Sequence, residues 1–500
     1  MFLAFKMRLL SFVIFAFLPA ASETSVVDPL SAGAVASVQV RIMNARKGYG
    51  QTYALRSSEP VVIEASAGIL AYVCALDPEG LVVVTADTRL TPVIAYCEHG
   101  SFSLSEDNPL LDILRADISR RLKALDLGLI SQRRIEANQR RWMEFLSCEE
   151  SASTAGESWP PAGQTLSGGW IESAWTQGSP YNDSCPMDPV TNVVCLAGCP
   201  AVTMGQIISF WQYPDSVIFK DEDSYTSDYL GRTIPIDAPA ASIPVIDYNH
   251  GDPSGGVCAD IAYACGVSTQ SVYTSQVSGV FTNSWCAHGL LEHFGFSTAE
   301  FRTGDGGDFY DVLEKNMKDS MPAIIVIVGE IGGHTLVCDG FRQSEDEEGE
   351  PEWHLNFGWG PYQPKALASC WYVIPDSLPL GLTTLVEAVV NIEAPRRPQP
   401  ASVNEKSPMK LSDLRCDPLV FKNHTVINYS LIQNSYVEIG IWDASGSKVL
   451  SLENEFQTAG NYSLSWDGKD ESGRTLPAGV YFVRLMADKQ RTGAKILLLR

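Results

Sequence analysis

The sequence is short of positive charge and of long apolar segments. Its 500 residues include 36 lysines and arginines against 59 aspartates and glutamates, which gives a net charge of −23. Such a chain lacks the basic surface that attracts nucleic acids and anionic membranes, so neither is the expected partner. The one early apolar run, residues 9–18, is too short to cross a bilayer, and no later segment looks like a membrane span. These features predict an acidic globular protein.

The first residues have the pattern of a targeting segment. Lys6 and Arg8 precede the apolar run, and the small residues Pro19-Ala20-Ala21-Ser22 follow it. A basic start, an apolar middle and a small-residue end are typical of a secretory signal that is removed from the mature protein. No cysteine follows the run where a lipoprotein anchor would need one. We therefore expect a signal peptide over residues 1–22 and a secreted or cell-surface bacterial protein.

The sequence also lacks a second Cys/His pair at the spacing of zinc ligands. Cys195 and Cys199 lie four residues apart, but no matching pair follows, so we expect no metal ion and no other cofactor. There are 12 cysteines, and several lie in apolar runs where buried thiols are expected. The best candidates for disulfides are Cys185 with Cys195 and Cys258 with Cys286, although pairing cannot be read from a sequence.

Changes in composition along the chain predict several domains. A chain of this length is too long for one core. A polar, Pro/Gly-rich stretch and a later Pro-rich stretch are typical of linkers, and the first of them would be open to proteolytic nicking. The expected parts are a signal peptide (1–22), a first α+β domain (23–147), a linker (148–165), a second α+β domain (166–393), a Pro-rich linker (394–410) and a β-sandwich (411–500).

Alternating and continuous apolar runs predict the main elements of these parts. Asn108-Pro109 has the pattern of a helix start, with an apolar helix over 110–127. After residue 410, several short strands at regular spacing predict the sandwich. The strands expected in the first domain are 71–76, 81–86 and 93–97, and those of an antiparallel sheet in the second are 322–328, 334–338, 353–357 and 370–374.

The segment from Gly198 to Ile207 places a cysteine directly before a predicted helix. Pro200 suits the first helical position, because its φ is already helical and its missing N–H would be unpaired there. A thiol at a helix N-terminus lies near the positive end of the helix dipole, which favours the thiolate. Cys199 is therefore a candidate nucleophile, and it needs a base and oxyanion donors elsewhere in the chain.

His334 is the best candidate for the base. It follows Gly332 and Gly333, which leave the backbone accessible, and it begins an apolar strand. Asn356 lies at the end of another strand and could accept the imidazole N–H, as the third member of a triad does. Trp359, three residues further on, could shield that hydrogen bond from water.

Gln177 precedes Cys199 by 22 residues. Its side-chain amide and the backbone N–H of Cys199 could together form an oxyanion hole.

The order Gln…Gly-Cys…Gly-His…Asn resembles that of the papain-like cysteine peptidases, and in detail the streptopain family of secreted bacterial peptidases. The resemblance is carried by Trp175–Asn182, Gly198–Pro214, Gly333–Gly340 and His354–Gly360. It implies a two-lobed catalytic domain with a helical part and an antiparallel sheet, in which Cys199 is the nucleophile, His334 the base, Gln177 the oxyanion donor and Asn356 the orienting residue. Gly333 and Trp359 would lie beside the substrate.

The resemblance extends beyond the catalytic domain. Residues 23–147 are similar to the inhibitory propeptide of that family, most clearly in Gly80–Arg89. The C-terminal part resembles the immunoglobulin-like modules that end many exported bacterial proteins and in some of them act as type IX sorting domains. This implies that the propeptide is an intramolecular inhibitor and the secretion machinery a partner, although Lys495–Arg500 matches the sorting signal only loosely.

The sequence departs from the family at three places near the site. Phe357 stands where tryptophan is usual, Pro361 where a third glycine is common, and Pro200 where a small β-branched residue is usual. None of these changes removes a reacting group.

Our hypothesis from the sequence is a secreted cysteine endopeptidase that is made as a zymogen and hydrolyses peptide bonds in protein or peptide substrates through an acyl-enzyme. The alternative is an exported surface or binding protein whose peptidase-like domain is inactive.

Overall fold

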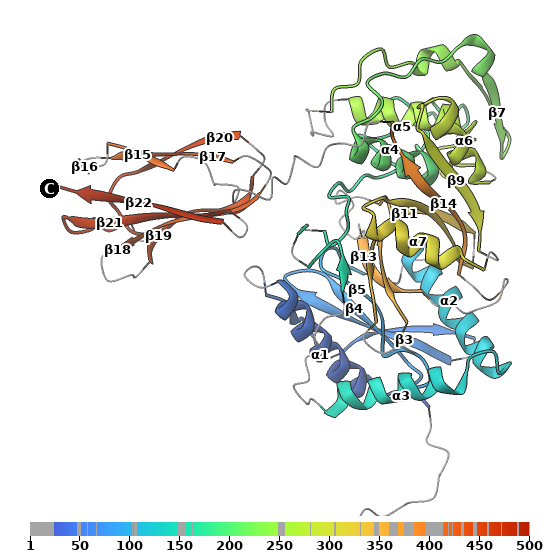
Figure 1. Ribbon diagram of the computed structural model, residues 1–500, viewed down its shortest axis with the longest axis horizontal. Coiled ribbons are helices and arrows are strands. Elements are labelled where there is room, and N and C mark those ends of the chain that lie inside the picture. The colour runs from blue at the N-terminus through green and yellow to red at the C-terminus, as the bar shows by residue number, and fades with distance from the viewer. Residues whose placement is uncertain are drawn as a thin grey trace, which may run out of the picture. The chain divides into compact units, whose positions relative to one another are not determined.

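The computed structural model resolves the chain into two compact units, residues 1–399 and 400–500, which are described separately below (Figure 1). The predicted signal peptide, most of both predicted linkers and Pro361 lie outside the described residues. The structure describes residues 25–395 and 414–499, apart from 48–51, 58, 67, 103, 105–107, 148–156, 163, 166, 249–255, 281, 305–306, 331, 345–349, 360–368, 375–381, 383, 419, 423, 432–434, 444–447, 458–459, 472 and 488–489.

The N-terminal part of the first unit is an α+β structure. The predicted helix is confirmed as α2, where the side chain of Asn108 accepts a hydrogen bond from the backbone N–H of Leu110 and Pro109 occupies the first turn. The three predicted strands are confirmed as β3 to β5. The elements are α1 (Pro29–Lys47), β1 (Ala54–Leu55), β2 (Val61–Ala65), β3 (Gly68–Asp77), β4 (Leu81–Thr85), β5 (Val93–Cys97), α2 (Pro109–Asp126) and α3 (Gln132–Ser147).

The following part combines a helical lobe with an antiparallel sheet, as the resemblance implied. One hydrophobic core surrounds α4 to α6 and another lies against the sheet, and β11 contributes side chains to both cores. The elements are β6 (Ser158–Trp159), α4 (Cys199–Trp211), β7 (Tyr225–Tyr229), β8 (Arg232–Ile236), α5 (Val257–Ser268), α6 (Ser284–Glu292), β9 (Thr298–Thr303), α7 (Phe309–Lys318), β10 (Ala323–Val328), β11 (Gly333–Arg342), β12 (Glu352–Asn356), β13 (Ser369–Val373) and β14 (Leu385–Glu393), with short 3₁₀ turns at Asp221–Asp223 and Ala238–Ala241.

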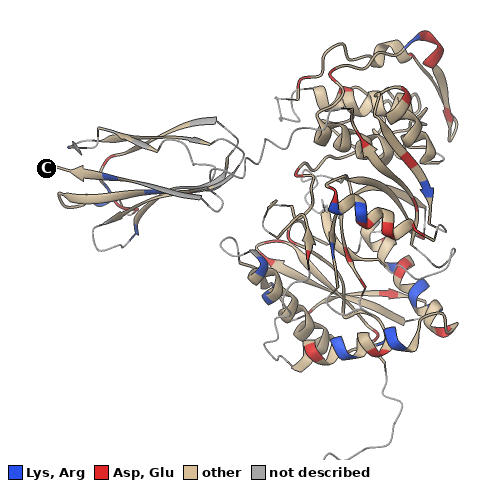
Figure 2. Ribbon diagram, viewed as in Figure 1, with Lys and Arg blue, Asp and Glu red and all other residues tan. Residues whose placement is uncertain are grey.

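A single sheet joins these two parts of the first unit. Its strand order is β1-β3-β4-β5-β13-β12-β11-β10-β14-β9, so the strands of the N-terminal part continue directly into those that follow. The junction is the antiparallel pair β5–β13, in which Trp371 lies opposite Tyr96 and Tyr372 opposite Ala95. In Figure 2 charged residues lie along α2, α3 and α7, whereas the strands are largely uncharged, as expected for a buried sheet with helices over it.

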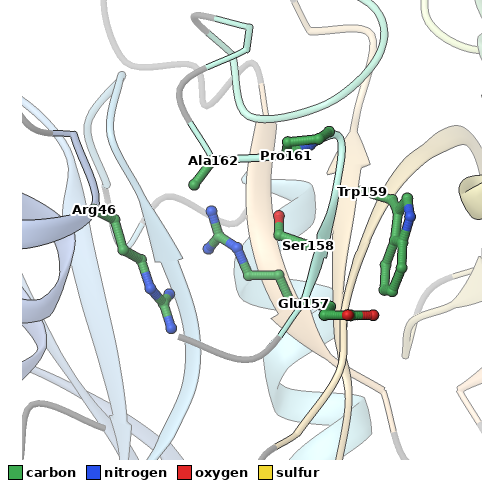
Figure 3. A pocket seen from close by; sticks show the side chains of 7 residues that line it. Arg46, Glu157, Ser158, Trp159, Pro161 and Ala162 are labelled. Carbon is green, nitrogen blue, oxygen red and sulfur yellow. The ribbon is translucent and has the colours of Figure 1, made fainter. Parts of the chain in front are cut away.

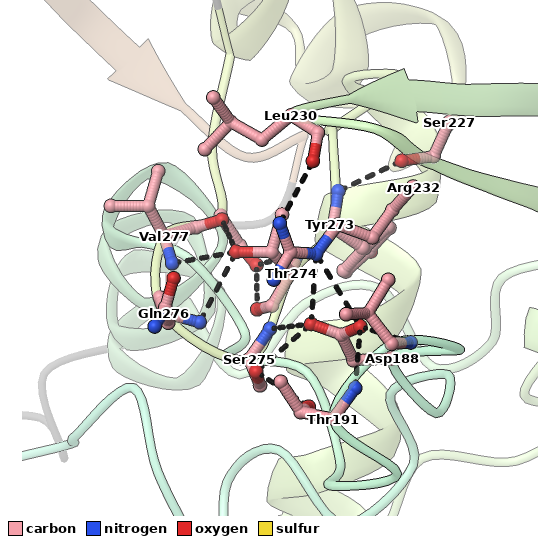
Figure 4. Close-up of polar contacts among 12 residues, drawn as sticks. Asp188, Thr191, Ser227, Leu230, Arg232, Tyr273, Thr274, Ser275, Gln276 and Val277 are labelled. Carbon is pink, nitrogen blue, oxygen red and sulfur yellow. Dashed lines mark hydrogen bonds and ion pairs between the residues drawn. The ribbon is translucent and has the colours of Figure 1, made fainter.

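A buried carboxylate, Asp188, fixes the long loop that leads to α4 (Figure 4). Its oxygens accept hydrogen bonds from the backbone N–H groups of Val190 and Thr191 at 2.8 and 3.3 Å. They also accept the N–H and hydroxyl of Ser275, at 3.0 and 2.9 Å, and pair with the Arg232 guanidinium at 3.2 Å. The bonds from Ser275 hold the pKa of the Asp188 carboxyl well below its ordinary value. Asp188 therefore ties the loop before α4 to a second loop, around residue 275.

The second unit is the predicted β-sandwich. One sheet has the order β15-β17-β20 and the other β16-β22-β21-β18-β19. Side chains from both sheets, including Tyr429, Ile439 and Trp466, share one hydrophobic core. The strands are β15 (Arg415–Asp417), β16 (Val420–Phe421), β17 (Thr425–Leu431), β18 (Ser435–Asp443), β19 (Lys448–Gln457), β20 (Gly460–Trp466), β21 (Gly479–Ala487) and β22 (Gln490–Leu498).

Two further findings concern the described residues of the whole chain. None of their helices combines the length and the apolarity that spanning a membrane requires. The structure places none of the described cysteines in a disulfide, including both pairs that the sequence offered as candidates.

Candidate active site

Cys199 is the first residue of α4, as the sequence predicted. Gly198, the residue before it, has a φ of +90°, which residues other than glycine rarely adopt. A Cβ atom at this position would also lie only 2.9 Å from the Ser278 carbonyl oxygen. Nearly every residue of α4 is buried, whereas Cys199 itself is half-buried. The backbone thus holds a partly accessible thiol at the N-terminus of a rigid helix, where the free N–H groups favour an anion.

His334 lies beside this thiol, at the start of β11. Strand β11 packs on α4, where the Thr203 hydroxyl donates a hydrogen bond to the Thr335 carbonyl at 3.2 Å. Burial alone would raise the pKa of the Cys199 thiol, but the charge and hydrogen bond of His334 bring it below its ordinary value. Burial would likewise lower the pKa of His334, and the charge and hydrogen bond of Cys199 raise it above its ordinary value. These opposite shifts favour a thiolate–imidazolium pair.

A backbone carbonyl holds the other side of the imidazole. The Nε2 atom of His334 lies 3.1 Å from the carbonyl oxygen of Phe357. A carbonyl can only accept, so Nε2 must carry the hydrogen, which leaves Nδ1 to face the thiol. The Trp359 ring lies over the imidazole, with ring centroids 4.8 Å apart, and stacks on Phe357 at 4.7 Å. The aromatic rings therefore cover the hydrogen bond that orients His334.

The side chain of Asn356 lies next to this arrangement but bonds elsewhere. Its Nδ2 donates to the carbonyl of Ser173 at 2.9 Å, and its Oδ1 accepts the N–H of Gly358 at 3.2 Å. The expected hydrogen bond from the imidazole to this amide is taken in the structure by the carbonyl of the next residue, Phe357. Asn356 thus fixes the turn that presents the carbonyl, and it ties the end of β12 to the segment that leads to Gln177.

Gln177 lies next to the nucleophile's own segment. Its carbonyl accepts the N–H of Ala197 at 3.0 Å, and its side chain is half-buried. Just before it, the Trp175 ring packs so closely on α4 that a Cβ at Gly205 would lie 2.4 Å from the ring. Close packing on a glycine therefore holds the Gln177 segment against the helix that carries Cys199.

Gly333, the residue before the candidate base, begins β11 opposite Val328. It is exposed, so it leaves one side of His334 open.

Two residues near the thiol carried no recognisable signal in the sequence. A hydrogen bond from the backbone of Thr335 also lowers the pKa of Cys199, after the larger contribution of His334. The Thr335 hydroxyl donates to Oδ1 of Asn283 at 2.9 Å, and both residues are buried. Which residues form a pair such as Thr335 and Asn283 depends on which segments of the chain meet behind the site. This is known only once the fold is known.

His354, on β12, forms a second buried pair. Its Nδ1 lies 2.6 Å from Oδ1 of Asp339. The other carboxylate oxygen accepts the N–H of Ile171 at 2.8 Å. Both side chains are fully buried, so this pair anchors the start of the catalytic part to the sheet.

The N-terminal part contacts the loop that leads to His334. Asp112, on α2, accepts the N–H of Glu330 at 2.9 Å. Arg120, two turns further along the same helix, donates to the carbonyl oxygens of Val328 and Gly329 at 2.5 and 3.3 Å. The backbone between β10 and β11 is thus held by side chains of the N-terminal part.

A cavity of about 400 Å³ lies at the boundary between the same two parts, and neither Cys199 nor His334 lines it (Figure 3). Its wall includes Arg46, Arg342 and Trp159. The Arg342 guanidinium also stacks on the Trp371 ring at 3.6 Å. Among the described residues, no group of three or more His, Cys, Asp or Glu side chains could hold a metal ion.

Comparison with known proteins gives three matches along the chain. Residues 175–363 match the Peptidase C10 family, residues 26–122 match the Spi protease inhibitor family, and residues 425–491 match the FlgD Ig-like domain. The first and second matches fall on the two parts that share the sheet, and the third falls on the sandwich.

Curated relatives agree with these matches. Streptopain of Streptococcus pyogenes is 22% identical over 312 residues, which is 58% of this chain and 71% of streptopain. The thiol protease/hemagglutinin PrtT of Porphyromonas gingivalis is 23% identical over 197 residues, which is 37% of this chain and 22% of that protein. Among solved structures, a fragment of prointerpain A from Prevotella intermedia has 20% identity and a TM-score of 0.49, and the match covers 68% of this chain and 99% of the fragment. The chain thus carries a papain-like Peptidase C10 domain, preceded by a Spi-type propeptide domain and followed by a FlgD Ig-like module.

Proposed function

We propose that this chain is a secreted cysteine endopeptidase that is made as a zymogen. The observation that carries the proposal is the pairing of Cys199 with His334, in which the pKa of the thiol is lowered and that of the imidazole is raised. A thiolate beside an imidazolium is the reactive form of a cysteine nucleophile.

The proposed reaction gives each group of the site a role. The Cys199 thiolate attacks a peptide carbonyl, and the oxyanion is stabilised by the backbone N–H of Cys199 and the side-chain amide of Gln177. His334 then donates its proton to the leaving amine, which leaves an acyl-enzyme. Water hydrolyses this intermediate with His334 as base, and the thiolate is restored. The Phe357 carbonyl keeps the imidazole in the tautomer that these steps require.

The zymogen part of the proposal assigns the inhibitory role to residues 23–147. The Spi-type match and the contacts of α2 with the loop before His334 support this role. Cleavage within the linker 148–165 would separate the inhibitory domain from the catalytic domain, 166–393. A Pro-rich linker, 394–410, then leads to the module at 411–500.

The proposed route out of the cell rests on the two ends of the chain. Residues 1–22 have the pattern of a signal peptide, and the C-terminal module is of a type found in exported bacterial proteins. We therefore include the secretion machinery among the proposed partners, together with protein or peptide substrates.

The decisive experiment compares Cys199→Ala with Cys258→Ala. Both thiols are half-buried, and Cys199 lies beside the His334 imidazole. We expect Cys199→Ala to abolish casein hydrolysis and self-maturation, and Cys258→Ala to retain both. Activity of Cys199→Ala at the unsubstituted level would contradict the proposal. Failure of Cys199 to react with iodoacetamide in the processed protein would favour an inactive, binding role for the domain.

A further inference from the structure

Two cysteines face each other across the boundary between the inhibitory and catalytic domains. Cys97 is the last residue of β5 and Cys370 the second residue of β13. Trp371 pairs with Tyr96 in the antiparallel register of these strands, so the next pair along the ladder is Cys370 with Cys97. The two thiols are thus cross-strand neighbours on different domains.

Both side chains lie on the same face of the sheet. Cys97 and Cys370 belong to the core around β10 to β13, whereas their neighbours Tyr96 and Trp371 belong to the core on the other face. The exposed fraction is 1% for Cys97 and 2% for Cys370. Burial raises the pKa of the Cys97 thiol well above its ordinary value, and a hydrogen bond with Cys370 raises it further. The thiols therefore contact each other in a dry environment.

Among the cysteines that the structure describes in this sheet, the geometry suits a disulfide between these two residues and no other pair. Directly opposite residues in an antiparallel ladder have Cβ atoms roughly 4.5–5.5 Å apart, and the lower end of this range meets the upper end of the roughly 3.5–4.5 Å that a disulfide needs. Cys338 lies on the same face but two strands away from Cys370, across Leu355, which is a separation of about 9–10 Å. Cys74 lies on the opposite face of the sheet, in the other core.

We propose that Cys97 and Cys370 form a disulfide that ties the inhibitory domain covalently to the catalytic domain. The inference rests on the proposed function in one respect, because export places the chain in a compartment where disulfides persist. Two free thiols in contact across a domain boundary are the reduced form of this link.

The reaction requires a disulfide oxidant, such as oxidised glutathione or an oxidoreductase disulfide. The thiolate of one cysteine attacks a sulfur of the oxidant, which forms a mixed disulfide and releases one thiolate. The second cysteine attacks the protein sulfur of that mixed disulfide, so the Cys97–Cys370 bond forms and the second thiolate of the oxidant leaves. The two protons from the cysteines end on the released thiolates. Because both cysteines are buried in the folded chain, the exchange takes place during folding.

Such a disulfide changes whether cleavage of the linker releases the inhibitory domain. Without it, the inhibitory domain can dissociate as soon as the linker is cut. With it, the nicked domain stays at an effective concentration on the order of millimolar and rebinds. Release then requires two events, cleavage of the backbone and reduction of the disulfide.

The direct test is disulfide mapping of the full chain with Cys199→Ala, which removes self-cleavage and makes the result independent of peptidase activity. The chain is refolded in a glutathione redox buffer, alkylated and digested without reduction. We expect a peptide that joins Cys97 to Cys370. Free, alkylated Cys97 and Cys370 in a chain with native circular dichroism would overturn the inference, as would a link from either residue to another cysteine. If the link is found but the unsubstituted chain has no peptidase activity, the proposed function fails alone.

A second measurement tests the consequence of the link. A recognition site for a sequence-specific protease is inserted within 148–156 of the same chain, and the product is run on a denaturing gel. We expect one band without reductant and two bands with it. Cys97→Ser and Cys370→Ser should each give two bands under both conditions. Cys74→Ser, a buried cysteine on the opposite face, should behave like the parent chain. Two bands from the unreduced parent would overturn the proposal, even where a serine variant fails to fold.

Discussion

Removal of the Asp117 carboxylate should weaken the attachment of the inhibitory domain far more than removal of a surface charge. Asp117 and Arg121 lie one turn apart on α2 and are fully buried. Asp117 accepts hydrogen bonds from the Tyr372 hydroxyl at 2.9 Å and from Thr384, and both of these residues lie in the catalytic part. Arg121 donates to the Val373 carbonyl at 2.5 Å. The two charged side chains of α2 thus bind each other and also bind groups of the catalytic part, across the boundary.

The expected magnitude follows from the burial of this pair. Loss of one partner of a buried ion pair costs about 3–5 kcal/mol, because the remaining charge stays in a medium of low dielectric constant. Asp117→Asn removes the nearer of the two carboxylates that pair with Arg121, at 2.9 Å, and leaves Glu350 at 3.4 Å. The double change Asp117→Leu with Arg121→Met removes both charges of the helix, and Glu350 keeps its contact with Arg134 at 3.7 Å. Because Glu350 still balances part of the Arg121 charge, we expect the single variant to lose about 3 kcal/mol of the free energy of unfolding, the lower end of that range, and the double variant to lose clearly less.

The assay is urea unfolding of the full chain in a Cys199→Ala background. The matched control is Asp319→Asn, which breaks an exposed i,i+4 pair with Lys315 and should cost less than about 1 kcal/mol. A loss for Asp117→Asn as small as that of the control would refute the reasoning. So would a double variant that loses the sum of its single changes, because the two charges would then not be coupled.

Four further predictions concern the site and the helix that supports it. The rate of Cys199 alkylation by iodoacetamide should reach half its maximum below the ordinary pKa of cysteine, about 8.5, and His334→Ala should move that midpoint upward. Hydrolysis should fall at low pH as the thiol is protonated through its lowered pKa, and at high pH as His334 is deprotonated through a pKa raised above about 6.5. Gly205→Ala should lose about 1–3 kcal/mol in urea unfolding, because the new methyl group overlaps the Trp175 ring. Trp359→Ala should lower kcat/KM by up to about tenfold, since an aromatic contact contributes about 0.5–1.5 kcal/mol, while circular dichroism stays native.

The sequence predicts best those features of the site that local chemistry determines. Gly198 followed by Cys199 and Pro200 predicts a helix start, and α4 begins there. Gly332 and Gly333 before an apolar run predict that His334 lies at a strand start, and β11 begins at residue 333. In both cases the residues that specify the backbone are neighbours in the chain, so no knowledge of the rest of the fold is needed.

The features that escaped prediction depend on partners far away in the chain. The acceptor for the His334 ring is the carbonyl of Phe357, and a backbone carbonyl has no residue type that a pattern could reveal. Asn356 was expected to accept that hydrogen bond because its side chain has the right chemistry. In the structure the same chemistry holds a turn, through Gly358 and Ser173.

The same limit applies to the sheet. An alternating or apolar run predicts that a strand exists, but not which strand lies beside it. The strands of each domain were predicted without a pairing between the domains, and the pairing of β5 with β13 was not foreseen. This junction places the cross-strand cysteines and the buried charges of α2 at one boundary.

Helix α2 connects that boundary to the site. Asp117 and Arg121 bind β13 and its surroundings, while Asp112 and Arg120 of the same helix hold the backbone that leads to His334. Because α2 is one continuous helix of 18 residues, we expect that a change which detaches its buried charges also weakens its hold on the loop. Detachment and loop release are therefore expected together in this fold. Asp117→Asn should increase hydrogen exchange in the amides between β10 and β11 as well as in α2. Unchanged exchange in that loop would show that α2 can detach without releasing the loop.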